Sequence, residues 1–163
     1  MTKSQSSPQS AAARRSAEAE VRGLIATFAP EHEGLIGTMR RSLRKRLPTA
    51  HEVVYEYSDS FVISYSPDER GYEGVLAIRA GAKGVDLYFN RGKGLPDPEK
   101  LLRGSAKLVR FIHMEGASTL ARPAVARLID EAIARNDVPF ASAGRGPVII
   151  RSTTARKRGR SPA

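Results

Sequence analysis

GLPDPEKLLRGSAKLVRFI, residues 94–112, is the stretch that decides the fold, because it joins a turn, a short helix and a basic strand in one order. Its proline and glycine residues predict a turn over 92–98, since both residue types interrupt regular structure. The paired leucines that follow indicate a short helix near 97–103. After them, alternating apolar side chains predict a strand over 107–114. The stretch contains no catalytic set of side chains, so it indicates a fold rather than a reaction.

Upstream of this stretch, apolar and polar side chains alternate in four short runs. The runs lie near residues 53–57, 61–65, 75–78 and 85–89. A period of two is typical of strands with one buried face. The connections between the runs are short and rich in turn-forming residues, which suits antiparallel hairpins and leaves no room for parallel crossovers. Together with 107–114, they predict an antiparallel sheet of about five strands.

Three segments have the period of an amphipathic helix: 17–29, 31–47 and 123–135. The first has apolar residues at the spacing i, i+3, i+4 and i+7 from Val21, and Ser16 is its predicted N-cap. The chain therefore predicts an α+β domain with two N-terminal helices, an antiparallel sheet and a closing C-terminal helix. The apolar residues expected in one shared core are Leu24, Phe28, Leu43, Ile63, Leu87, Ile112, Leu128 and Ile133.

The composition of the 163-residue chain fits one domain with an apolar core, because 40% of its residues are hydrophobic. The chain has no cysteine, which excludes disulfides, thiolate nucleophiles and cysteine-ligated metals. It has no apolar run long enough to cross a membrane and no apolar stretch typical of a secretory signal. We therefore expect a soluble, cytoplasmic protein without membrane contact; the sequence sets no oligomeric state.

The net charge of +10 is unevenly distributed along the chain. Residues 151–163 have no acid and five cations, which are Arg151, Arg156, Lys157, Arg158 and Arg160. Because this segment has no apolar period, we expect 139–163 to be a loop followed by a disordered basic tail. Residues 1–15 are rich in Ser, Gln and Ala and are expected to be a disordered tail as well. The folded domain is then expected over 16–138.

A family resemblance depends on the order of short motifs in and around the fold-deciding stretch. These motifs are Leu95-Pro-Asp-Pro98, Leu101-Leu102, Gly104, Lys107 and Arg110-Phe-Ile112. The motifs follow the N-terminal helices and strands and precede the final helix, and in this order they resemble the YdhG-like family of small bacterial domains. The resemblance covers about residues 21–136. The function of that family is mostly unassigned, although some relatives are described as frataxin-like iron carriers. The chain departs from the usual pattern at Ala106, where glycine is common, and at Phe111, where histidine is common.

The iron hypothesis that the resemblance implies has little support in the residues. Hard cations prefer clustered carboxylates. The close acidic pairs Glu18 with Glu20 and Glu31 with Glu33 are explained by their favourable position at helix N-termini. The three histidines do not have a metal-binding spacing. We therefore predict no metal site and no cofactor.

Patterns typical of catalysis are also missing from the sequence. Ser105 and Lys107 lie two residues apart, but without a recognisable oxyanion element or a GxSxG elbow. The glycine-rich pieces 81–84 and 91–94 do not have the spacing of a phosphate-binding loop and are expected to be turns. The sequence therefore favours a protein without enzymatic activity.

Two groups of basic residues are candidates for anion binding. The first group is Lys93, Arg103, Lys107 and Arg110. The second group, at the end of the second helix, is expected to contact nucleic acid together with the C-terminal cations and consists of Arg40, Arg41, Arg44, Lys45 and Arg46. Each group also has a structural explanation that does not involve a ligand. The first group could pair with nearby acids, and the second could compensate the dipole of its helix.

These observations predict a non-catalytic binding domain for an anionic partner, with basic tails that contact nucleic acid non-specifically. Two alternatives stay open. One is a frataxin-like iron carrier. The other is a small-molecule-binding domain or enzyme that uses the surface of residues 91–110.

Overall fold

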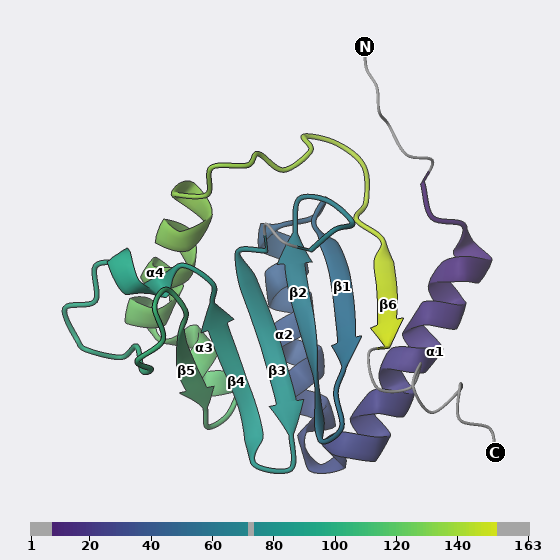
Figure 1. Ribbon diagram of the computed structural model, residues 1–163, viewed down its shortest axis with the longest axis horizontal. Coiled ribbons are helices and arrows are strands. Elements are labelled where there is room, and N and C mark those ends of the chain that lie inside the picture. The colour runs from purple at the N-terminus through teal and green to yellow at the C-terminus, as the bar shows by residue number, and fades with distance from the viewer. Residues whose placement is uncertain (1–7, 72–73, 153–163) are drawn as a thin grey trace.

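A computed structural model of the chain shows an α+β fold (Figure 1). It describes residues 8–71 and 74–152. Most helices and strands lie where the periods of apolar residues predict them. The elements η1 and η2 are single turns of 3-10 helix. In chain order the elements are α1 (Ala11–Phe28), η1 (Pro30–His32), α2 (Glu33–Arg46), β1 (His51–Glu56), β2 (Ser60–Ser66), β3 (Leu76–Gly81), β4 (Gly84–Phe89), η2 (Gly92–Gly94), β5 (Arg110–Met114), α3 (Ala117–Ala121), α4 (Pro123–Ala134) and β6 (Val148–Ser152).

The strands form one mixed sheet in the order β5-β4-β3-β2-β1-β6. Strands β1 to β5 pair antiparallel with their neighbours in the chain, which confirms the predicted meander. Strand β6 pairs parallel with β1, from Val148 opposite Glu52 to Ser152 opposite Glu56. The prediction of an entirely antiparallel sheet was therefore wrong. Residues 135–147 cross the end of the sheet and bring an apolar run to β1. The chain from β2 to α4 lies between the two strands, and parallel neighbours require a long connection of this kind.

Helix α1 starts earlier than the sequence predicts. The hydroxyl of Ser10 accepts a hydrogen bond from the backbone N–H of Ala13 at 3.0 Å and caps the helix. Ser16, the predicted N-cap, lies inside the helix. Residues 11–15, predicted to belong to a disordered tail, are therefore helical, because their alanines favour a helix once Ser10 caps it.

The helix predicted over 97–103 does not form. The carboxylate of Asp97 accepts hydrogen bonds from the backbone N–H groups of Leu101 and Leu102, both at 2.9 Å, and Lys100 has a φ of 56°. A side chain that bonds to its own downstream backbone competes with helical hydrogen bonds, and a left-handed residue ends a helix. Strand β5 accordingly starts at Arg110 rather than at 107. The short helix α3 was not predicted.

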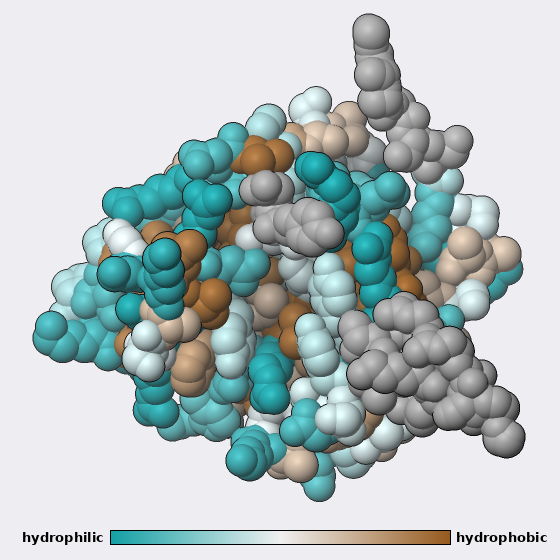
Figure 2. All heavy atoms as spheres, viewed as in Figure 1, coloured by the Kyte–Doolittle hydropathy of each residue, from teal (hydrophilic) through white to brown (hydrophobic). Residues whose placement is uncertain are grey.

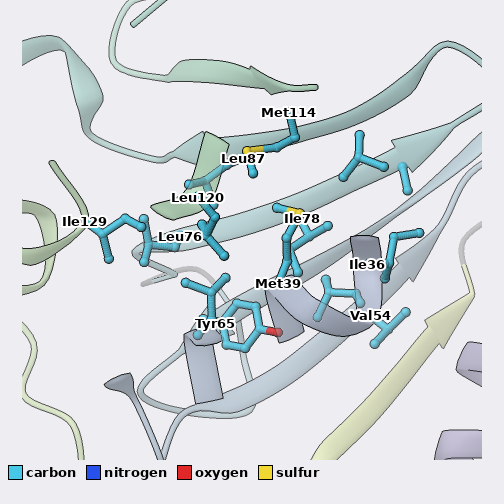
Figure 3. Close-up of a cluster of buried hydrophobic side chains, with 14 of the residues drawn as sticks. Ile36, Met39, Val54, Tyr65, Leu76, Ile78, Leu87, Met114, Leu120 and Ile129 are labelled. Carbon is cyan, nitrogen blue, oxygen red and sulfur yellow. The ribbon is translucent and has the colours of Figure 1, made fainter. Parts of the chain in front are cut away.

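The helices and one face of the sheet enclose a single core. In Figure 1, α2, α3 and α4 lie behind the sheet and α1 runs beside β6. Figure 3 shows Ile36 and Met39 of α2 and Ile129 of α4 against side chains of the strands. Six of the eight residues expected in the core lie in it, and the other two, Phe28 and Ile133, are partly buried and pack against it. Within the described residues, no helix has both the length and the apolar character to cross a bilayer.

Candidate functional site on the open face of the sheet

The face of the sheet opposite the helices, here called the open face, has two rows of side chains that run across the strands. Alternation places every second residue of a strand on this face. One row consists of Tyr55, Val62, Arg79, Asp86 and His113. The next row consists of Val53, Ser64, Ala77, Tyr88 and Phe111. Figure 2 views the molecule from this side and shows pale and brown residues across the strands.

A groove of about 570 Å³ lies on the open face. Its volume is within the range that is typical of sites for small ligands. The β1–β2 hairpin, the middle strands and the segment before β5 all contribute to its lining. The side chains that concern its chemistry are Tyr57, Asp59, Arg79, Tyr88, Asn90 and Val109. We call this site the open-face groove.

Arg79 is the cation of the open-face groove. It lies on β3, and its side chain is partly exposed. Within residues 8–71 and 74–152, Arg79 forms no side-chain hydrogen bond and no ion pair. The acid opposite it on β4, Asp86, contacts His113 Nδ1 through Oδ1 at 2.9 Å. The guanidinium of Arg79 therefore keeps its donors available to a ligand.

Two tyrosines line the groove together with Arg79. Tyr57 follows β1, and 42% of its surface is exposed. Tyr88 stacks on Phe111, with ring centroids 5.2 Å apart and ring planes at 21°. Burial and the charge of Asp86 raise the pKa of Tyr88, so its hydroxyl remains protonated at neutral pH and can donate a hydrogen bond. The groove therefore combines a cation, aromatic ring faces and a hydroxyl donor.

Asp59 and Asn90, two further polar residues of the groove, are held by contacts within the protein. Asp59 Oδ1 accepts a hydrogen bond from Ser60 Oγ at 3.0 Å. Asn90 Nδ2 donates to the carbonyl oxygen of Gly74 at 2.7 Å and ties the end of β4 to the segment before β3. These bonds keep the rim of the groove in place and leave Arg79 as its available charged donor.

None of the four residues of the first predicted anion-binding group belongs to the lining of the groove. Lys93, Arg103 and Lys107 have exposed side chains in the segment between β4 and β5. Arg110 is partly buried, and its Nη1 donates to the carbonyl oxygens of Ala106 at 2.6 Å and Val109 at 2.8 Å. Arg110 therefore stabilises this segment, whereas the other three present charge to solvent.

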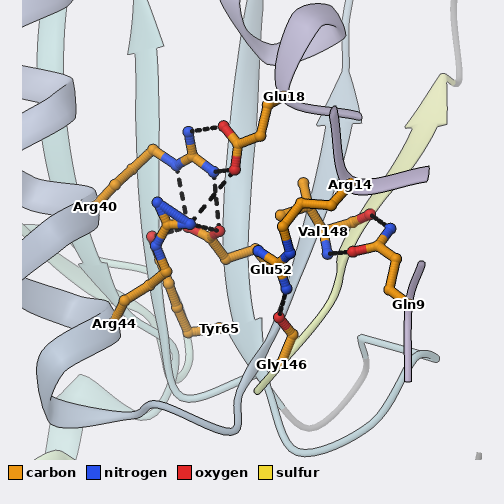
Figure 4. A network of polar contacts seen from close by, with 9 residues as sticks. All are labelled: Gln9, Arg14, Glu18, Arg40, Arg44, Glu52, Tyr65, Gly146 and Val148. Atoms are coloured by element: carbon orange, nitrogen blue, oxygen red, sulfur yellow. Dashed lines mark hydrogen bonds and ion pairs between the residues drawn. The ribbon is translucent and has the colours of Figure 1, made fainter. Parts of the chain in front are cut away.

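Behind the sheet, Arg40 connects α1, α2 and β1 through two carboxylates (Figure 4). Its guanidinium donates to Glu18 at 2.9 and 3.0 Å and to Glu52 at 2.9 and 3.1 Å. The Tyr65 hydroxyl donates to Glu52 at 2.5 Å. Burial alone would lower the pKa of Arg40, but its hydrogen bonds to Glu52 and Glu18 raise it above the usual value. We call these residues, with Arg44, the buried ion-pair network.

The five basic residues predicted at the end of α2 thus have different roles. Arg40 is buried in the network, and Arg44 reaches the same two carboxylates at 3.3 and 3.4 Å. Arg46 pairs with an aspartate of α4. Arg41 and Lys45 have exposed side chains, so they are the members of this group that present charge to solvent.

The C-terminal cations lie partly outside the described residues. Arg151 belongs to β6 rather than to a tail, and its Nη2 donates to the carbonyl oxygen of Glu69 at 2.6 Å. Arg156, Lys157, Arg158 and Arg160 are outside the described residues. Within the described ranges, no group of three or more His, Asp or Glu side chains is placed to hold a metal ion.

No protein-family model, curated protein or solved structure matches the chain. The resemblance to the YdhG-like family therefore stays a prediction that depends on the motifs of residues 94–112.

Sequence reasoning did not find the open-face groove. Arg79 is a single cation within an apolar strand, and only the strand register shows that it shares a face with Tyr88. One signal was present, because a charged residue at an alternating position of a strand usually faces away from the core. That signal does not say which other strands supply the neighbouring side chains.

Proposed function

We propose that this chain is a non-catalytic binding domain that holds an anionic ligand in the open-face groove. The observation that carries the proposal is Arg79, which lies partly buried on a middle strand without an ion-pair partner in the described part of the chain. A partly buried charge that has lost water without gaining a partner is unfavourable. An anionic group placed against Arg79 would supply that partner.

The chemistry of the groove favours an anionic group that presents two oxygens side by side. A guanidinium has a rigid fork of N–H donors that matches the two oxygens of a carboxylate or phosphate. The rings of Tyr57 and Tyr88 would contact the apolar or aromatic body of the ligand, and the Tyr88 hydroxyl would donate to a polar atom. Val109, which lines the groove, belongs to the predicted surface of residues 91–110.

The basic residues away from the groove form the second part of the proposal. Arg41 and Lys45 on α2, with the cations beyond the described residues, would add contact to phosphates that does not depend on base sequence. A chain without cysteine is also compatible with a reducing compartment, so we propose that the protein acts in the cytoplasm.

A thermal-shift screen of carboxylates, phosphates and nucleotides tests the proposal. A ligand at 100 times its Kd stabilises the folded state by about 2.7 kcal/mol, so a specific anion should raise Tm measurably. Arg79→Gln should abolish the increase. Arg22→Gln removes the same charge from an exposed site on α1 and should retain it. The proposal is wrong if no anion stabilises the wild-type protein, or if Arg79→Gln responds as the wild type does.

A further inference from the structure

We infer that the anionic ligand of the open-face groove is a single-stranded nucleic acid, with an unpaired base on Tyr57 and a phosphate against Arg79. The inference rests on the proposed function of the groove and names its ligand class. It is argued from the placement of aromatic rings, from the spacing of cations and from the net charge of the chain.

One exposed apolar side chain lines the groove, and a second precedes a residue of its lining. In the described part of the chain, the large hydrophobic residues that are exposed are Tyr57 at 42% and Leu108 at 51%. Tyr57 lines one side of the groove, and Leu108 precedes Val109, which lines another. An exposed ring next to a cation is the combination with which open sheets bind unpaired bases, because every base has a face that can stack on the ring.

A second cation extends the site beyond the size of a mononucleotide. Arg151 pairs in register with Tyr55, so it belongs to the same cross-strand row as Arg79. Three strand spacings separate the two arginines, which is about 14 Å. Arg151 Nη2 bonds to the exposed carbonyl oxygen of Glu69, so the end of its side chain lies at the surface. A ligand with phosphates at intervals can contact both arginines.

The acids near the groove form no ion pair with Arg79 in the described part of the chain. Asp86 contacts His113, and Asp59 accepts a hydrogen bond from Ser60. The chain as a whole has a net charge of +10, which attracts a polyanion. The ligand is single-stranded rather than double-stranded, because the bases of a duplex are stacked on each other and cannot place a face on Tyr57.

Fluorescence with 2-aminopurine tests the inference on the full chain. The probes are decamers of RNA and of DNA with one central 2-aminopurine, the matching duplexes, and AMP. Binding of a single strand should change the 2-aminopurine fluorescence through stacking, whereas contact with a basic tail alone should not. The RNA and DNA arms show whether the 2′-hydroxyl contributes to affinity.

Two groove variants and one matched control complete the experiment. Arg79→Gln and Tyr57→Ala should each weaken binding about tenfold, and Tyr57→Ala should remove the fluorescence change. Arg22→Gln removes the same charge from an exposed site on α1 that has no part in the proposed binding, and it should weaken binding less than about threefold. If circular dichroism shows that Arg79→Gln is unfolded, Arg79→Lys takes its place. Lysine keeps the positive charge but lacks the planar set of N–H donors, so this variant should still weaken binding measurably.

The outcomes separate this inference from the proposed function. If duplexes bind as tightly as single strands, or if Arg22→Gln weakens binding as much as Arg79→Gln, the strand does not occupy the groove and the inference is overturned. If AMP or another small anion stabilises the protein through Arg79 while the decamers do not bind, the inference fails and the proposed function stands. If the binding of no anion depends on Arg79, both the inference and the proposed function fail.

Discussion

Arg79 and Asp86 lie directly opposite each other on β3 and β4, yet they form no ion pair in the described part of the chain. Asp86 Oδ1 instead contacts His113 Nδ1 on β5 at 2.9 Å. Opposite residues on one face of a sheet have Cβ atoms about 5 Å apart, so the alternative pairing is within reach. The contact between Asp86 and His113 therefore keeps Arg79 available to a ligand.

Variants of this pair should change ligand affinity in opposite directions. Asp86→Asn should raise the affinity for the stabilising anion about threefold to tenfold, because it removes a negative charge beside Arg79. His113→Ala should lower the affinity by a similar factor, because Asp86 can then turn to Arg79. Isothermal titration calorimetry measures both. A change in the same direction for the two variants would show that this contact does not control Arg79.

The buried ion-pair network should be essential for stability. Arg40→Met removes the closest cation from the carboxylates of Glu18 and Glu52 and leaves them only the longer contacts to Arg44, and Glu52 is 1% exposed. Breaking a buried pair by removing one partner typically costs about 3–5 kcal/mol. Urea unfolding should show a loss of this size for Arg40→Met, and a loss below about 0.5 kcal/mol for the exposed control Arg41→Met. Equal losses in the two variants would contradict a special role of Arg40.

Acidic pH should destabilise the protein through His51. Burial lowers the pKa of His51, although Asp68 and Glu69 act in the opposite direction, and its Nδ1 atom is buried without a hydrogen-bond partner in the described residues. The unfolded chain therefore binds the proton first. The contribution of His51 to stability is present above about pH 6.5 and is lost as pH falls from there through the folded pKa.

Urea unfolding at pH 7.5 and pH 5.5 measures this effect. The free energy of unfolding of the wild type should decrease between the two pH values, and His51→Gln should decrease less, because it removes the titrating group. The same decrease in both proteins would assign the pH dependence to other residues.

The sequence predicted the elements whose pattern is local. The strands β1 to β4 and the helix α4 appear where periods of two and 3.6 indicate them. Alternation in β1 does not say which of its faces is buried, and the structure places Glu52 under the helices and Tyr55 on the open face. The role of Arg40 could not be predicted either, because only the packing of the helices on β1 brings the carboxylates of Glu18 and Glu52 to it.

Strand β6 shows a second limit of prediction from sequence. Its apolar run is short, from Val148 to Ile150, and basic residues typical of a tail follow it. Its pairing partner β1 lies about a hundred residues earlier in the chain, so no local pattern indicates the contact. The open-face groove was missed for the same reason, since its lining comes from Tyr57, Arg79 and Val109, which are distant in sequence.

The docking of β6 should depend on one glycine. Gly146 donates its N–H to the carbonyl oxygen of Pro48 at 3.0 Å, two residues before β6 begins. A Cβ atom at this position would lie 1.7 Å from the carbonyl oxygen of Ala50, which is backbone and cannot turn away. Gly146→Ala should therefore force the segment off β1 and cost about 3 kcal/mol.

Hydrogen exchange and urea unfolding together test this prediction. In Gly146→Ala, the amides of β6 and β1 should exchange faster, while those of β3 and β4 should remain protected. Gly34→Ala is the matched control, because this glycine lies in α2 and a Cβ atom there would have nothing within 4 Å. It should raise stability by about 0.5–1 kcal/mol, since alanine favours a helix more than glycine does. If Gly146→Ala has wild-type stability and protection, then the parallel pairing of β6 with β1 does not hold that end of the sheet.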